Sequence, residues 1–378
     1  MNKLIYLDNA ATTYPKPDSV IRAVSECMRS RGGNPGRGSH RLSTAADSLV
    51  FDCRAAAAEM FGARPENVVF TLNATHALNM AIKGIVRPGC HVLIDNFAHN
   101  ASYRPLCALA DAGVCEFDIY DASGTDDETI ESITKHLRDN TTLLIATHQS
   151  NICSKVLPVA KIGQLCGANG IHFCVDAAQS AGHLPINVRK MGIGSLCMPG
   201  HKGLFGPMGI GMLITDGSTE YSTITEGGAG INSLDTAMPD ELPEHLEAGT
   251  LPLPAIGGLL AGLRYVKSAG IAEIHIHECA MAAAFTEHIK NNKNISLCGS
   301  ADGSVVSFRY AGYTPSEYGA YMARHGICLR SGYHCAPLAH RTLSSIDEGL
   351  IRVSFSYMNR MSDITALCNA IDAFPVTK

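Results

Sequence analysis

The sequence has no apolar stretch long enough to cross a membrane. The longest one, residues 251–263, is interrupted by two prolines and three glycines, whereas a spanning helix needs about 20 consecutive apolar residues. The N-terminal segment MNKLIYLDNAATTYPKP also lacks the charged-then-apolar layout of a secretory signal. We therefore expect a cytoplasmic protein that makes no membrane contact.

Cysteine pairs at metal-binding or redox spacing are absent as well. The 14 cysteines are spread singly and no two of them form a CxxC pair, which excludes a zinc ribbon and a dithiol redox motif. In a protein without a secretory signal, we interpret most of these residues as reduced, buried thiols. No metal site is predicted.

A basic excess is the third missing feature. The 30 lysine and arginine residues stand against 35 aspartate and glutamate residues, which gives a formal charge of −5. Proteins that bind the phosphate backbone of nucleic acids carry a clustered basic excess, so we expect no nucleic-acid partner. The 378 residues suffice for two domains, since a domain takes about 150 residues.

Short runs rich in valine and isoleucine alternate with helical stretches over residues 67–214. The pattern predicts strands at 67–71, 91–95, 114–120, 142–147, 172–176, 195–198 and 209–214, with helices at 75–85, after His99, at 129–137 and at 159–167. Because these strands are apolar on both faces, the pattern favours an α/β fold with a parallel sheet covered by helices.

The later part of the chain follows a different pattern. Residues 226–246 are rich in glycine, aspartate and proline, which predicts an extended excursion. A long helix at 254–268 then leads to an α+β region. We expect helices at 271–290, 315–325 and 362–374 and strands at 303–309, 327–330 and 350–355.

Polar or ionisable side chains follow five of the predicted strands. In an open α/β sheet, ligands bind beyond the carboxyl ends of the strands. These ends are followed, in chain order, by Thr75, by His99, by Asn151, by Asp176 with Gln179, and by His201 with Lys202. Each residue alone has an ordinary structural explanation, because a hydroxyl or carboxylate often caps a helix, a lone histidine is usually structural, and a lone lysine is usually solvated.

Together, however, these residues are the set that a pyridoxal phosphate enzyme requires. A lysine joins the cofactor covalently, an aspartate keeps the pyridine nitrogen protonated so that the ring accepts electrons, and a helix start holds the phosphate. We therefore predict pyridoxal 5'-phosphate (PLP) as the cofactor.

Several motifs resemble the class V aminotransferase family, and within it the group II (SufS-like) cysteine desulfurases, a branch that includes selenocysteine lyases. The motifs are VDAAQS at 175–180, GHKGLFGPMGIGML at 200–213, EAGT at 247–250 and LRSGYHCAP at 329–337. The resemblance runs nearly end to end, from YLDNAATT at 6–13 through NPGRGSHRLS at 34–43 to IRVSFSYMN at 351–359. It implies the fold of PLP-dependent transferases of fold type I. The large PLP-binding domain would span 1–255, with the first 15 or so residues able to pack on the small domain, and 256–378 would form the linking helix and the small α+β domain carrying Cys335 and Arg352.

The resemblance also implies a role for each matching residue. Lys202 matches the lysine that binds the cofactor, Asp176 the partner of its pyridine nitrogen, Gln179 the donor to its phenolic oxygen, and His99 the catalytic histidine that stacks on its ring. Thr75 and His201 match phosphate ligands, and Thr250 matches a phosphate ligand that the neighbouring subunit of a homodimer supplies. Asn151 and Arg352 match residues that bind the substrate carboxylate, which a guanidinium can hold in a bidentate manner. Cys335 matches the cysteine that accepts sulfur as a persulfide.

The implied reaction converts L-cysteine to L-alanine. Lys202 would act as the base at Cα, and the Cys335 thiolate would attack the substrate sulfur and carry it to an acceptor protein, for iron–sulfur clusters, tRNA thiolation or selenium metabolism. Three departures from the family stand out: Pro199 where a serine or threonine is usual, which offers neither a hydroxyl nor an N–H group, Asn73-Ala74 where Gly-Thr is usual, and a shorter 226–246 segment.

Other activities fit the same residues. A selenocysteine lyase would use them on a selenium substrate, and another class V transamination or C–S lyase reaction would leave Cys335 without an essential role. A non-enzymatic thiol-rich sulfur or metal carrier is disfavoured, because CxxC spacing is absent and the whole cofactor set is present.

Overall fold

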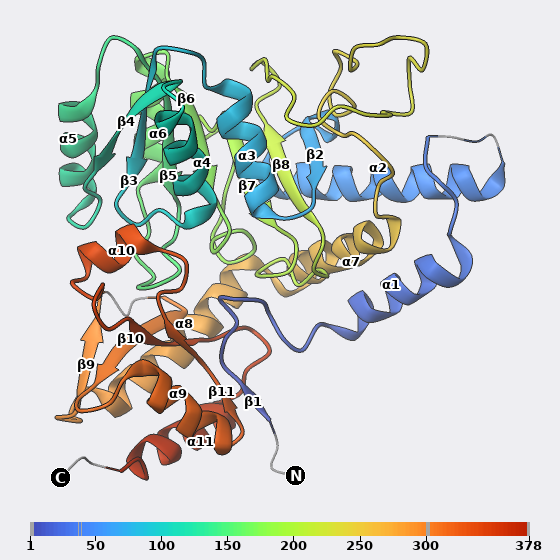
Figure 1. The fold of residues 1–378 in the computed structure, drawn as a ribbon. Coiled ribbons are helices and arrows are strands. Elements are labelled where there is room, and N and C mark those ends of the chain that lie inside the picture. The colour runs from blue at the N-terminus through green and yellow to red at the C-terminus, as the bar shows by residue number, and fades with distance from the viewer. Residues whose placement is uncertain (1–3, 37, 39, 300–302, 376–378) are drawn as a thin grey trace.

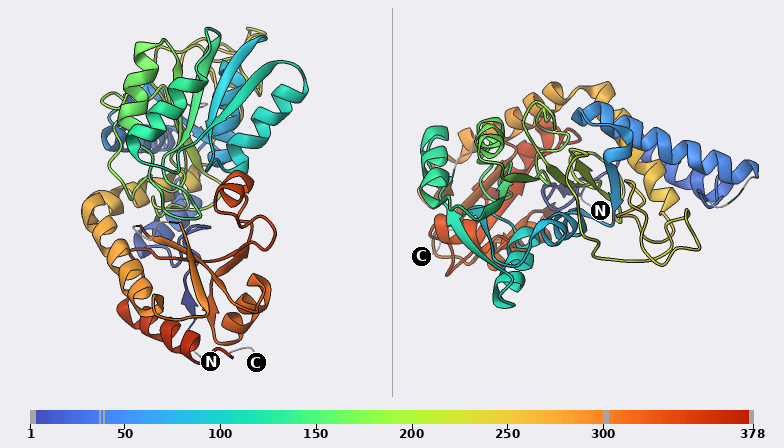
Figure 2. Two further views of the ribbon diagram at one scale, coloured as in Figure 1. Left: turned by 90° about the vertical axis from the view of Figure 1, so that its left-hand side faces the viewer. Right: turned by 90° about the horizontal axis from the view of Figure 1, so that it is seen from above.

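The structure is a computed structural model, and it describes residues 4–36, 38, 40–299 and 303–375. Two units lie one above the other, as the left view of Figure 2 shows. The large unit is built on a seven-stranded sheet and the small unit on a four-stranded sheet (Figure 1). The strand order in the large sheet is β2-β8-β7-β6-β5-β3-β4. Its strands are β2 (Val68–Thr71), β3 (Cys90–Asp95), β4 (Cys115–Tyr120), β5 (Thr141–Thr147), β6 (His172–Asp176), β7 (Ser195–Pro199) and β8 (Gly211–Thr215).

The large sheet is parallel except at β8, which is antiparallel to both of its neighbours. Helices cover both faces, because successive side chains of a strand point to opposite sides. Leu143 and Ile145 of β5 pack in the same core as α3 (Ala74–Ile85) and α4 (Asn100–Asp111). Leu144 and Ala146 pack in the core of the other face. The helices on that second face are α2 (Arg41–Phe61), α5 (Asp126–His136), α6 (Val159–Ala168) and α7 (Leu253–Ala269).

The small unit has an antiparallel sheet in the order β12-β13-β10-β9. Its strands are β9 (Ile295–Cys298), β10 (Val305–Tyr310), β12 (Arg330–Gly332) and β13 (Leu350–Ser354), and its helices are α8 (Ile271–Ile289), α9 (Pro315–Arg324), α10 (Pro337–Thr342) and α11 (Met361–Asp372). Phe285, Phe308 and Tyr318 lie at the centre of its core.

The N-terminal segment reaches the small unit. Strand β1 (Ile5–Tyr6) pairs in parallel with β11 (Ile327–Cys328), and the Ser354 N–H group donates to the Leu7 carbonyl at 2.8 Å. Helix α1 (Asp18–Ser30) then packs on α7, and a short 3-10 turn, η1 (Pro65–Asn67), precedes β2. The domain boundary that we place between residues 255 and 256 falls in the first turn of α7, and it stays a proposal.

The structure confirms the predicted α/β fold with a mostly parallel central sheet, and it differs in two details. Residues 327–330, expected as one strand, are β11 and β12 in different sheets, because Ile327 pairs with Ile5 whereas Arg330 pairs with Arg352. No prediction covered β1, α1, α2, η1, β9 or α10. Residues 226–246, expected as an extended excursion, contain no helix or strand. None of the described helices combines the length and apolar character needed to cross a bilayer.

Candidate active site

The carboxyl ends of five strands of the large sheet meet at one cleft. The empty space in this cleft, counted with its open mouth, is about 540 Å³. It is lined by Asn73, Ala74, Thr75, His99, Ala101, Thr147, Gln149, Asn151, Asp176, Ala178, Gln179, Pro199, His201 and Lys202. The structure therefore brings together seven of the residues that the sequence singled out, and their individual roles stay predictions.

Lys202 lies in the loop after β7, and its environment favours the neutral amine. Burial is the main cause that lowers the pKa of Lys202 to about 8; the Asp176 carboxylate opposes this shift, while Arg352 and Arg330 add to it. Residues of the N-terminal segment form hydrogen bonds to the peptide bond before Lys202. The His201 carbonyl accepts hydrogen bonds from Thr12 Oγ1 at 3.1 Å and Lys16 Nζ at 2.6 Å.

Asp176 ends strand β6 and is 3% exposed. Burial raises the pKa of this carboxyl group, while the Ala178 N–H group, which donates to Oδ1 at 2.9 Å, and the Lys202 charge oppose that shift. A buried carboxylate beside a half-buried lysine is a pair of perturbed groups in a cleft, which is typical of functional sites.

His99 is the N-cap residue of α4, and its Nδ1 accepts a hydrogen bond from the Ala101 N–H group at 3.0 Å. Burial first, then the charges of Lys202 and Arg352, lower its pKa to about 4. The ring is therefore neutral at ordinary pH, and because Nδ1 accepts, Nε2 carries the proton.

One end of the cleft is suited to an anion. Helix α3 begins at Ala74, so the N–H groups of its first turn, which includes Thr75, have no partner within the helix. His201 Nδ1 is buried and finds no hydrogen-bond partner among the described residues. Asn73 caps the helix, with Oδ1 accepting from the His76 N–H group at 3.0 Å. Pro199 lines the same cleft and offers no donor.

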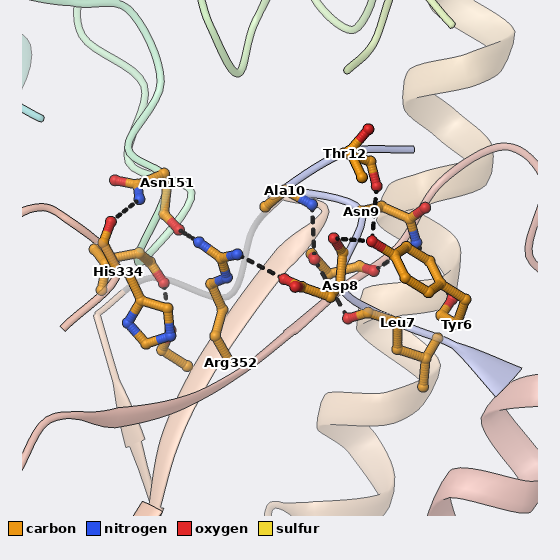
Figure 3. Close-up of polar contacts among 12 residues, drawn as sticks. Tyr6, Leu7, Asp8, Asn9, Ala10, Thr12, Asn151, His334 and Arg352 are labelled. Carbon is orange, nitrogen blue, oxygen red and sulfur yellow. Dashed lines mark hydrogen bonds and ion pairs between the residues drawn. The ribbon is translucent and has the colours of Figure 1, made fainter. Parts of the chain in front are cut away.

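Arg352 lies in β13 of the small unit and is 2% exposed. It does not line the cleft, but it contacts Asn151, which does. Its Nη2 lies 2.8 Å from Asp8 Oδ1, and its Nη1 donates to the Asn151 carbonyl at 3.0 Å. The Asn151 side chain in turn donates through Nδ2 to the His334 carbonyl at 2.9 Å. Figure 3 shows this chain of contacts, with Arg352 between Asn151 and Asp8. Burial lowers the pKa of the guanidinium, and Asp8 opposes that shift.

Cys335 follows His334, between β12 and α10, and is exposed. Its backbone carbonyl accepts a hydrogen bond at 2.8 Å from the N–H group of Asn100, the first residue of α4 and the neighbour of His99. The persulfide cysteine expected from the resemblance therefore belongs to a loop that contacts the cleft through its backbone.

Of the predicted residues, Thr250, Arg352 and Cys335 do not line the cleft. Gln179 lines the cleft, and its Nε2 donates to the Ala10 carbonyl at 2.9 Å. Thr250 does not reach this cleft; it is exposed in a separate depression beside Arg54, Glu247 and Gly249. A role for Thr250 at the site of a neighbouring subunit stays a prediction.

Sequence reasoning missed several residues at the site. Thr147 and Gln149 line the cleft, and their positions at and just after the end of β5 were the signal that could have found them. Asp8 lies within the quoted YLDNAATT motif, but no role was assigned to it. Among the described residues, no three His, Cys, Asp or Glu side chains gather in a way that could hold a metal ion.

The sequence profile of the aminotransferase class-V family matches residues 5–367. The chain belongs to the aminotransferase class-V family. A protein of Methanothermobacter thermautotrophicus named "probable cysteine desulfurase" is 30% identical over 97% of this chain and 94% of its own length. One of Pyrococcus abyssi with the same name is 28% identical over 98% of this chain and 94% of its own length.

Solved structures of cysteine desulfurases are similar over the same length. The apo cysteine desulfurase of Thermococcus onnurineus NA1 has a TM-score of 0.89 at 28% identity, covering 98% of this chain and 94% of its own. The cysteine desulfurase CsdA of Escherichia coli, in an S-sulfonic acid form, has a TM-score of 0.89 at 24% identity with the same coverage, which supports the fold alone. The predicted fold class and the prediction of a class V enzyme are confirmed, whereas the group II branch stays a prediction.

The class V family is PLP-dependent, and the residues at the cleft fit that cofactor. The cleft offers a half-buried lysine beside a buried carboxylate at the ends of neighbouring strands. His201 Nδ1 also belongs to the cleft and has no hydrogen-bond partner among the described residues. The N-terminus of α3 lines the same cleft and is suited to a phosphate.

Proposed function

We propose that this protein is a PLP-dependent cysteine desulfurase that takes sulfur from L-cysteine and leaves L-alanine. The names of its relatives support this substrate, and the grouping of Lys202, Asp176 and His99 in one cleft supports the cofactor. The observation that carries the proposal is the chain of contacts from Arg352 through Asn151 to the loop of Cys335.

The cofactor, when bound, supplies an electron sink for the carbanion at Cα. Lys202 would bind it covalently, Asp176 would hold its pyridine nitrogen, His99 would stack on its ring and Gln179 would donate to its phenolic oxygen. Thr75, His201 and the first N–H groups of α3 would hold its phosphate, joined by Thr250 of a second copy in a homodimer.

Arg352 and Asn151 would hold the substrate carboxylate. Arg352 has N–H groups left over, because each Nη nitrogen has a single contact in the chain to Asp8 and Asn151. The lowered pKa of Lys202, about 8, leaves part of its amine neutral near pH 7, so that Nζ can take the proton from Cα.

Cys335 would receive the sulfur. Its thiolate forms an S–S bond with the substrate sulfur while the substrate C–S bond breaks, and the electron pair of the broken bond takes up a proton on carbon. The balance is L-cysteine plus the Cys335 thiol going to L-alanine plus the Cys335 persulfide, with no external oxidant. The persulfide would pass its outer sulfur to an acceptor protein, for iron–sulfur cluster assembly or another sulfur pathway in the cytoplasm.

The deciding experiment measures L-alanine release from L-cysteine with a reductant, for the wild type and for Cys335→Ser. We expect the variant to keep the cofactor absorption band and to lose cysteine turnover. Cys328→Ser, which changes a half-buried cysteine seven residues earlier, is the matched control and should remain active.

The same assay separates the alternatives. L-selenocysteine is tested in parallel, and turnover of this substrate alone would indicate a selenocysteine lyase. Full cysteine activity in Cys335→Ser would indicate a different class V reaction in which Cys335 is not essential. In either case the proposed persulfide step would be withdrawn.

A further inference from the structure

The backbone around Cys335 adopts an unusual conformation. His334 has φ of 50° and Cys335 has φ of 58°, so two consecutive residues with side chains occupy the left-handed region. Such backbone is strained and persists only where the surroundings impose it. The contacts that impose this turn therefore decide where the Cys335 thiol lies.

Two of these contacts come from the large unit and hold backbone carbonyls. Asn151 Nδ2 donates to the His334 carbonyl at 2.9 Å, and the Asn100 N–H group donates to the Cys335 carbonyl at 2.8 Å. Within the turn, the Ala336 N–H group donates to the Tyr333 carbonyl at 3.1 Å. None of these bonds fixes the His334 side chain.

A second histidine contacts that side chain from within the small unit, in addition to the Arg330 backbone. The ring planes of His334 and His340 are parallel, at an interplanar angle of 4°, and the ring centroids lie 5.7 Å apart. His334 Nδ1 lies 3.5 Å from His340 Nε2, and His340 Nδ1 lies 2.8 Å from Ser345 Oγ. His334 is 5% exposed, and His340 is fully buried.

We propose that His340 and Ser345 are positioning residues that hold the turn of Cys335 through the His334 ring. Neither residue lines the cleft of Lys202, so neither touches the reacting atoms. The expected effect on sulfur transfer rests on the proposed function. The expected effect on the backbone of the turn rests on the structure of the turn alone.

The rings act as neutral hydrogen-bonding groups. Burial, with the Arg352 charge and His340 adding to it, lowers the pKa of His334 to about 2, and burial also lowers the pKa of His340. Two neutral imidazoles can share one N–H group between them, whereas two imidazolium rings would repel each other. The pairing therefore persists at neutral pH.

The test uses the cofactor-loaded enzyme and three variants. His340→Phe keeps a ring against His334 but removes both hydrogen bonds, His340→Gln keeps a group able to bond to His334, and Ser345→Ala removes the far end of the chain. His325→Phe changes an exposed histidine at the end of α9 and is the control. The readouts are hydrogen exchange in the peptide that covers residues 333–336 and the rate of persulfide formation on Cys335 in the first turnover.

We expect His340→Phe to speed exchange of the turn amides and to slow persulfide formation by about tenfold or more, because a displacement of about 1 Å costs up to a hundredfold in rate. Ser345→Ala should change both readouts in the same direction, and His340→Gln should lose less than His340→Phe. Cofactor absorption and the KM for L-cysteine should stay at their wild-type values. Wild-type exchange and persulfide rates in both Ser345→Ala and His340→Phe would overturn the inference.

Two safeguards keep the outcome clear. If His340→Phe does not fold, Ser345→Ala decides the question, since it removes only a hydroxyl group. If the wild type itself forms no persulfide from L-cysteine, the proposed function fails, and the exchange rates of the turn still decide whether His340 and Ser345 hold it.

Discussion

Arg352 Nη2 lies 2.8 Å from Asp8 Oδ1, and this ion pair joins strand β13 to the N-terminal segment (Figure 3). The two side chains are 2% and 19% exposed, so the guanidinium charge is withdrawn from water and depends on a partner. The pair holds Arg352 beside Asn151, a residue that lines the cleft, before any substrate carboxylate arrives. Asp8 is therefore both a structural counterion and a neighbour of the proposed substrate site.

Asp8→Ala should lower the free energy of unfolding by about 3 kcal/mol, because removing one partner leaves a buried, uncompensated charge. Chemical denaturation of the cofactor-free protein measures the change. Glu66→Ala is the control, since the Arg64–Glu66 pair is exposed and its atoms lie 3.9 Å apart; its loss should be about 0–1 kcal/mol. Equal effects of the two substitutions would contradict the view that the Asp8 pair is the stronger one.

Lys202 should react as an amine with a midpoint near pH 8 in the cofactor-free protein, because burial lowers its pKa to about 8. Only the neutral amine is nucleophilic, so the rate of labelling by trinitrobenzenesulfonate should rise as the pH passes through this value. Peptide mass spectrometry assigns the label to Lys202. Asp176→Asn should move the midpoint lower still, since the Asp176 charge favours protonated Lys202. A midpoint near 10, the usual value for lysine, would show that the amine is solvated.

The part of the site that lies on the large sheet could be predicted from the sequence. Asp176 and Lys202 follow apolar runs that are unmistakable as buried strands, and the ends of parallel strands meet at one edge. A residue that directly follows a predicted parallel strand can therefore be placed at this edge from the sequence. The same reasoning could have extended to Thr147 and Gln149.

The contacts between the units could not be predicted in this way. Asp8 and Arg352 are 344 positions apart, and no local pattern relates them. The left-handed backbone at His334 and Cys335 could not be predicted from the sequence either, because neither residue is the glycine or asparagine that usually signals such a turn. These features follow from how the units pack, which periodicity does not encode.

The buried pair of His183 and Glu278 should make stability depend on pH. Burial opposes the charged imidazole, but the charge and hydrogen bond of Glu278 together raise the pKa of His183 above its usual 6.5. The stabilisation by the charged pair is then fully present below pH 6.5 and is lost as the pH rises through the raised pKa. Glu278→Gln should lower the free energy of unfolding by about 3 kcal/mol at pH 6, and by less at pH 9.

Denaturation curves of the cofactor-free wild type and Glu278→Gln at the two pH values give this difference. Lys267 pairs with Glu59 on the surface, where both side chains are more than half exposed, so Glu59→Gln provides a control with little change at either pH. If Glu278→Gln lowered the free energy of unfolding more at pH 9 than at pH 6, His183 would not be charged in the folded protein.

Pro199→Ser should strengthen cofactor binding, because it places a hydroxyl group at the end of β7 in the cleft. His201 Nδ1, which has no hydrogen-bond partner among the described residues, belongs to the same cleft. A hydrogen bond to a charged group contributes about 1.5–3 kcal/mol, which corresponds to an affinity for PLP about ten- to a hundredfold higher. Titration of the cofactor-free protein with PLP and with pyridoxal, which lacks the phosphate, tests this. Pro199→Ala removes the ring without adding a hydroxyl, so it should match the wild type in both titrations. Only Pro199→Ser with PLP should gain; an equal gain with pyridoxal would assign the effect to the backbone instead of the phosphate.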